Sequence, residues 1–193
     1  MHNAFQYHQY LLHRQVLALT GKFRIYNPDR ELVLFSQQKM FSLKEDIRVY
    51  TDDRMSEELL WIKARQIIDF SAAYDVVDTA YNQKVGTLRR KGWSSMLRDE
   101  WQVLDANDNQ VGVMFEDSMG MALLRRFLLG SWLPQNYDIT LGETRVADLK
   151  QNFNLFRYEL NLDFTMDPSQ RLDRRLGIAA GILLAAVEGR QSN

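Results

Sequence analysis

The chain has 193 residues, of which 46% are hydrophobic and 25% are charged, and its formal net charge is −1. This size and composition are typical of one globular domain that buries a sizeable core, so we treat residues 1–193 as a single domain. A net charge so close to zero gives no overall field that would recruit nucleic acid, and the lack of cysteine excludes disulfides, thiolate metal sites and cysteine nucleophiles.

Most of the chain consists of short runs that alternate apolar and polar residues, separated by turns containing Asp or Asn. Such runs predict strands joined as hairpins. In chain order, the predicted strand pairs are residues 23–27 with 32–35, 47–50 with 59–63, 74–78 with 84–88, 101–105 with 110–115, and 137–141 with 145–149, followed by a last strand at 156–164. Each hairpin has one apolar face to bury, which indicates a sandwich or a closed barrel.

Residues 119–133 interrupt this pattern and predict one short helix, centred on residues 122–132. Asp117 or Ser118 would begin it, and Pro134 would end it. Three roles stay open for this helix: it covers one barrel opening, lies in a membrane interface, or presents an apolar patch for self-association. Its few polar residues favour the first role, because a free surface helix needs a polar face.

The segment at residues 176–187 is apolar on every side, so it must be buried either in lipid or inside its own protein. A membrane-spanning helix needs roughly 20 apolar residues, and Arg175 and Glu188 bound this shorter segment. We therefore predict no transmembrane span. The small residues Gly177 and Gly181 keep the helix thin enough for strands to approach it closely.

These patterns together predict an all-β fold, a closed β-barrel of hairpins around a central hydrophobic C-terminal helix. Asp167 is suited to cap that helix, Pro168 to occupy its first position, and Gly189 to end it.

Two of the predicted hairpins share a detailed pattern, in which Tyr74 or Trp101 begins a strand of the form aromatic-x-Val-x-Asp and the next strand contains Val-Gly. The strand at 156–164 then leads directly into the apolar segment at 176–187. In these features the chain, from about residue 10 to 187, resembles the Tubby-like superfamily, specifically the LURP-one-related and phospholipid-scramblase-like proteins. The resemblance implies a barrel of about twelve strands around a central C-terminal helix, without an established enzymatic activity.

The resemblance also implies a role near lipids, because Tubby domains bind phosphoinositides and scramblases are membrane-associated. Scramblases, however, have a proline-rich N-terminal region and a palmitoylated cysteine cluster, and both are absent here. Their acidic calcium segment corresponds to residues 161–167, which hold only Asp163 and Asp167 as acids. Scrambling and calcium control therefore do not follow from the resemblance.

One loop comes close to a metal site. Asp105, Asn107, Asn109 and Glu116 occupy EF-hand positions, but Gln110 replaces the required glycine, and the flanking residues alternate as strands do. We interpret this loop as a hairpin turn. The three histidines lack metal-ligand spacing, and no phosphate-binding loop or nucleophile elbow occurs. We therefore predict no metal, no cofactor and no catalytic residues.

The candidate binding residues are basic. Arg89, Arg90 and Lys91 precede Trp93 closely, and the pair Arg125 and Arg126 lies in the predicted helix at 122–132. Arginine binds phosphate in a bidentate manner, and tryptophan favours the interface of a lipid bilayer. The same residues also fit an ordinary solvated surface, where charges contribute little.

Two functional hypotheses follow. The first is a non-catalytic module that binds a membrane surface or anionic lipid head groups through these six residues. The alternative is a soluble scaffold or regulatory module that binds a protein partner, for example through the helix at 122–132. Residues 1–8 lack the features of a signal peptide, so we expect a cytoplasmic protein, peripheral to the membrane under the first hypothesis.

Overall fold

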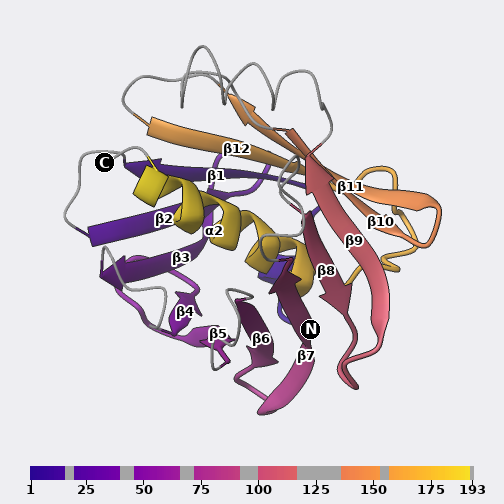
Figure 1. Ribbon diagram of the computed structural model, residues 1–193. Coiled ribbons are helices and arrows are strands. Elements are labelled where there is room, and N and C mark those ends of the chain that lie inside the picture. Colours follow the sequence, from indigo (N-terminus) through magenta and orange to yellow (C-terminus); the bar gives the residue numbers. More distant parts are fainter. Residues whose placement is uncertain are drawn as a thin grey trace.

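The computed structural model describes residues 1–15, 20–39, 46–65, 72–91, 100–116, 136–152 and 157–191. Within these ranges twelve antiparallel strands form a closed barrel, in which each strand pairs with its sequence neighbours and β1 pairs with β12 (Figure 1). The strands are β1 Gln9–Gln15, β2 Thr20–Tyr26, β3 Leu32–Lys39, β4 Ile47–Tyr50, β5 Glu58–Ala64, β6 Ala73–Asp78, β7 Gln83–Arg90, β8 Glu100–Leu104, β9 Gln110–Glu116, β10 Asn136–Leu141, β11 Thr144–Asn152 and β12 Arg157–Asp163. The helix α2, Arg174–Gln191, runs through the centre of the barrel (Figure 1), so the predicted fold is confirmed.

Five hairpins repeat one local design, which explains the sequence repeat. The hairpins β2–β3, β4–β5, β6–β7, β8–β9 and β10–β11 each contain a shift of register near the turn. Each turn also holds one residue with positive φ: Arg30, Met55, Asn82, Asp108 and Gly142. A left-handed residue followed by a bulge increases the twist of a hairpin. We call the end of the barrel formed by these five turns the turn end.

Alternation along the strands sorts side chains between the inside and the outside of the barrel. In β12, Leu160 and Leu162 are fully buried, whereas the intervening Asn161 is partly exposed. Strand β1 pairs with β12 and places Leu12 opposite Leu160. The sequence pattern did not single out β1 as a strand, because Leu11 directly precedes Leu12 and interrupts the strict alternation.

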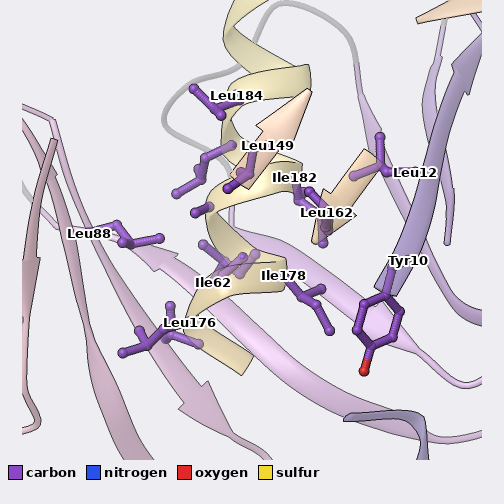
Figure 2. Close-up of a cluster of buried hydrophobic side chains, with 14 of the residues drawn as sticks. Tyr10, Leu12, Ile62, Leu88, Leu149, Leu162, Leu176, Ile178, Ile182 and Leu184 are labelled. Carbon is purple, nitrogen blue, oxygen red and sulfur yellow. The ribbon is translucent and has the colours of Figure 1, made fainter. Parts of the chain in front are cut away.

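The apolar segment fills the barrel lumen. Figure 2 shows Leu176, Ile178, Ile182 and Leu184 of α2 among side chains from the surrounding strands, and all four are at most 5% exposed. An added Cβ at Gly181 would lie 2.8 Å from Leu162 Cδ2, so any larger residue there would require Leu162 to shift. Among the described residues, no helix is both long enough and apolar enough to cross a bilayer.

The predicted start and end of this helix are wrong. Helix α2 begins at Arg174 rather than at Pro168, because Asp173 is the N-cap: its carboxylate accepts the Arg175 N–H (2.9 Å), and its carbonyl accepts the N–H groups of the following turn. The helix also continues through Gly189 to Gln191. Asp167 instead forms an ion pair with the buried Arg174 (3.1 Å).

The N-terminal residues close the turn end of the barrel. The short 3₁₀ helix η1, Asn3–Phe5, places Phe5 in the core with 1% exposure. The Tyr10 hydroxyl donates to the Ala4 carbonyl (3.0 Å) and accepts the Tyr7 N–H (3.2 Å). The connections at the opposite end all contain residues outside the described ranges.

Candidate functional site

The candidate basic segment lies where β7 ends, at the barrel end opposite the turn end. Its first residue, Arg89, pairs across the sheet with Ala73 of β6 and Gln102 of β8. Arg89 is partly exposed and lies on the outside of the barrel, one position after the inward-facing Leu88. Within the described part of the chain, no carboxylate forms an ion pair with it.

Arg90 takes the opposite orientation, as expected for the next residue in a strand. It pairs with Trp101, which is fully buried in the core, and its Cζ atom lies 5.9 Å from the centre of the Trp101 ring. Such a contact is a cation–π interaction. Arg90 therefore contributes to the inner side of the barrel end, and it does not share an outer surface with Arg89.

The charge of Lys91 is partly neutralised by Glu100. Its Nζ atom lies 2.5 Å from Glu100 Oε1, and its backbone N–H donates to the Glu100 carbonyl. The lysine side chain is still 39% exposed, so the pair is a surface ion pair that contributes little to stability. The structure thus brings three of the six candidate residues to one barrel end, but on different faces. Trp93, Arg125, Arg126 and the predicted helix at 122–132 lie outside the described residues.

Next to Arg89, on the outside of β6 and β7, a set of charged residues neutralises itself. Arg65 donates from Nε to both Asp75 oxygens (2.9 and 2.8 Å), and its Nη2 lies 2.7 Å from Asp108 Oδ1. Lys84 binds the same Asp108 oxygen at 2.7 Å, and the buried Thr87 hydroxyl donates to Asp75. These contacts link the β6–β7 hairpin to the β8–β9 turn.

The pKa values of these acids follow from the contacts. Hydrogen bonds from Lys84 and Arg65 lower the pKa of Asp108 to about 2. Burial acts to raise the pKa of Asp75, but hydrogen bonds from Arg65 and Thr87 outweigh it, and the pKa lies below its ordinary value. Both carboxylates are therefore ionised at neutral pH, and each already has cationic partners. Such a set of ion pairs stabilises the outer side of β6 and β7 and does not provide a general acid or base.

The EF-hand-like loop is a hairpin turn in the structure. Asp105 Oδ1 accepts the backbone N–H groups of Asn107 (2.8 Å) and Asn109 (2.9 Å), so this carboxylate closes the turn. No group of three or more potential metal ligands occurs among the residues that the structure describes.

Sequence reasoning did not reveal a groove of about 390 Å³ on the outside of β11, β12 and β1, near the β2–β3 turn. Its carboxylates are held by neighbours: Asp163 accepts from Gln9 Nε2 (3.0 Å), and Asp148 pairs with Lys150 (2.6 Å). Its lining comes from four separate segments, so no local motif could have predicted it.

Comparison with known proteins assigns the family. A family model described as LURP-one-related matches residues 32–185, which is well over half of the chain. No curated protein and no solved structure matches the chain significantly. The match extends from β3 into α2, the same part of the barrel in which the hairpin repeat and the buried helix occur. The chain therefore belongs to the LURP-one-related family.

Proposed function

We propose that this single-domain barrel is a non-catalytic module that binds an anionic membrane surface, or anionic lipid head groups, at the cytoplasmic face of a membrane. The contact is the segment at the end of β7, with Arg89, Arg90, Lys91 and Trp93, helped by the pair Arg125 and Arg126. One observation carries the proposal: Arg89 lies partly exposed on the outer wall without a carboxylate partner among the described residues.

The chemistry of Arg89 supports this assignment. A guanidinium binds a phosphate through two parallel hydrogen bonds, and its charge persists at any physiological pH. Lys91 keeps 39% of its side chain exposed beside Glu100, so it can exchange that partner for a phosphate. Each basic residue close to an anionic bilayer contributes about 1 kcal/mol to binding. Arg90, which lies against Trp101, supports the position of the segment.

The test is co-sedimentation with vesicles of neutral lipid and of neutral lipid mixed with an anionic lipid, at low ionic strength. We expect binding only to the anionic vesicles, with a decrease as salt is added, since salt screens the attraction. The double variant Arg89→Gln with Lys91→Gln should bind about 25-fold more weakly, from about 1 kcal/mol for each cation.

Arg54→Gln is the matched control, because Arg54 is an exposed cation in the β4–β5 turn at the opposite barrel end. It should bind as the wild type does. If the wild-type protein does not bind anionic vesicles at low salt, the proposed function is wrong, and a protein-interaction module becomes the better hypothesis.

A further inference from the structure

The cations of the described residues differ in how they are neutralised. In β10–β12 and at the start of α2, cations form ion pairs, as Arg145 does with Asp138 and Arg175 does with Asp78. Strands β2 and β5 differ, because Lys22, Arg24 and Lys63 form no ion pair with any described carboxylate. Arg54 and Arg89 also form no ion pair with a described carboxylate, and they lie at the two barrel ends. Strands β2 and β5 are the outer members of the four neighbouring strands β2–β5, so their three cations lie on one part of the barrel.

All of these cations lie on the outside of the barrel. Arg24 pairs across the sheet with Phe35, and its Cζ atom lies 5.7 Å from the centre of that ring. Arg48 of β4 pairs with Trp61 of β5. We call this outer surface of β2–β5, with Lys22, Arg24, Arg48, Trp61 and Lys63, the basic wall.

Trp61 is the centre of the basic wall. Arg48 Cζ lies 4.0 Å from the centre of its ring, and Lys63 Nζ lies 4.8 Å from it. Both distances are within the range of cation–π attraction. Arg48 also pairs with Glu58 at 2.6 Å, the one carboxylate within these strands in the described residues. The exposed Asp46 lies directly before β4, at the edge of the wall, and accepts the Ala64 N–H (3.2 Å). The wall therefore holds four cations and one anion around a partly exposed tryptophan.

The adjoining turn end has the opposite charge. The β2–β3 turn carries Asp29 and Glu31 with one cation, Arg30, and the β4–β5 turn carries Asp52, Asp53 and Glu57 with one cation, Arg54, so both turns are net negative. An anionic surface would repel these turns and attract the wall beside them. The charge distribution therefore selects one side of the barrel, and it orients the barrel relative to such a surface.

We propose that the basic wall is the face that lies flat against an anionic lipid bilayer, with Trp61 at the level of the head groups. This inference rests on the proposed function and adds a second contact and an orientation to it. Tryptophan beside basic residues favours the bilayer interface. A nucleic acid fits less well, because single strands bind by stacking bases on free aromatic faces, and two cations already lie over the Trp61 ring.

The Lys63 edge of the basic wall and the end of β7 are close enough to touch one planar surface together. Lys63 pairs with Asp75 on β6, and Asp75 pairs with Thr87 on β7, two residues before Arg89. Neighbouring strands are about 4.8 Å apart, so the strands of Lys63 and Arg89 are separated by roughly 10 Å. The charges between them belong to the self-neutralised set around Asp75.

The test compares cations that differ only in position. Lys63→Gln removes an exposed wall cation without breaking an ion pair, and Arg54→Gln removes an exposed cation at the turn end. Partitioning onto vesicles of neutral lipid mixed with anionic lipid should fall about fivefold for Lys63→Gln and about 25-fold for Lys22→Gln with Lys63→Gln. Arg54→Gln should leave this partitioning unchanged, and Lys63→Arg, which keeps the positive charge, should partition as the wild type does. Circular dichroism melts confirm that each variant is folded.

The outcomes separate this inference from the proposed function. If the wild type binds and the wall variants bind within twofold of it, the proposal that the basic wall contacts the bilayer is wrong. The proposed contact at the end of β7 is then unaffected. Equal losses in Lys63→Gln and Arg54→Gln also overturn the basic-wall proposal, because the effect would then come from net charge alone. No wild-type binding overturns both. Tighter binding to an RNA oligonucleotide than to the vesicles, lost in the double variant, overturns the bilayer as the occupant.

Discussion

Replacing Asp167 with alanine should destabilise the barrel more than any surface substitution, because this carboxylate holds a fully buried charge. Arg174 is 0% exposed; its Nη1 lies 3.1 Å from Asp167 Oδ2, and its Nη2 donates to the Asp167 carbonyl at 2.6 Å. The carboxylate also accepts the backbone N–H groups of Arg171 (3.1 Å) and Leu172 (3.0 Å). Asp167 thereby fixes the loop through which β12 enters the central helix.

The magnitude follows from what the substitution leaves behind. Removing one partner of a buried ion pair costs about 3–5 kcal/mol, because the remaining guanidinium keeps only neutral carbonyl partners and no opposite charge. For a domain of this size, each kcal/mol lowers the melting temperature by about 2–4 °C, so we expect a decrease of roughly 6–20 °C. Asp167→Asn should cost less, because its side-chain oxygen still accepts one of the backbone N–H groups.

Thermal and denaturant unfolding, followed by circular dichroism, measure this effect. Asp29→Asn is the control, because Asp29 is exposed in a turn, and such a change is expected to stay within about 0.5 kcal/mol. The double variant Asp167→Ala with Arg174→Met should regain part of the loss, since it removes the unpaired charge. A loss below about 1 kcal/mol in Asp167→Ala would refute the reasoning that Arg174 depends on this carboxylate.

Three further predictions concern the core, the turn end and the response to acid. Gly181→Leu should cost at least about 1–3 kcal/mol, since even a Cβ would lie 2.8 Å from Leu162 Cδ2; an unchanged melting temperature would contradict the enclosed helix. Tyr10→Phe should cost roughly 1–2 kcal/mol in denaturant unfolding, because it leaves the buried Ala4 carbonyl and the part-buried Tyr7 N–H without their partner. The pKa values of Asp75 and Asp108 are lowered in the folded state, so their contribution to stability is complete above the ordinary carboxyl pKa of 3.8 and is lost as pH falls through the lowered values. Melts between pH 5 and pH 2 should show this loss, and a Thr87→Val variant should show a smaller one.

The sequence predicted the barrel because its information is local and repeated. Every hairpin carries its own alternation and its own polar turn, as in the turn that Asp105 closes with its carboxylate. The central helix was predictable for a related reason: an apolar segment too short for a membrane has to be buried by protein. Both inferences use only neighbouring residues, so they did not depend on knowing which strands meet.

The helix start and the basic wall depend on contacts between distant segments, and the sequence did not reveal them. Asp167 and Pro168 carry the local signals of a helix start, but the pairing of Asp167 with Arg174 holds this stretch as a loop, and Asp173 caps the helix instead. The basic wall takes its residues from separate strands, and its members Arg48 and Trp61 meet only because β4 pairs with β5. Conversely, Arg89 and Arg90 form one motif in the sequence, yet they face opposite sides of a strand.

Because its lumen is filled, the described barrel can bind a ligand or partner only at certain surfaces. Barrels of the lipocalin type hold ligands inside. Here Ile178, Ile182 and Leu184 occupy the lumen among inward side chains such as Leu162, and these four residues are at most 1% exposed (Figure 2). A ligand inside would have to displace α2, and the buried pair of Asp167 and Arg174 holds the start of that helix in place. Recognition by the described residues must therefore use the outer wall or the barrel ends. There the cations of β2 and β5, together with Arg89 of β7, are among the groups whose charge no described carboxylate balances.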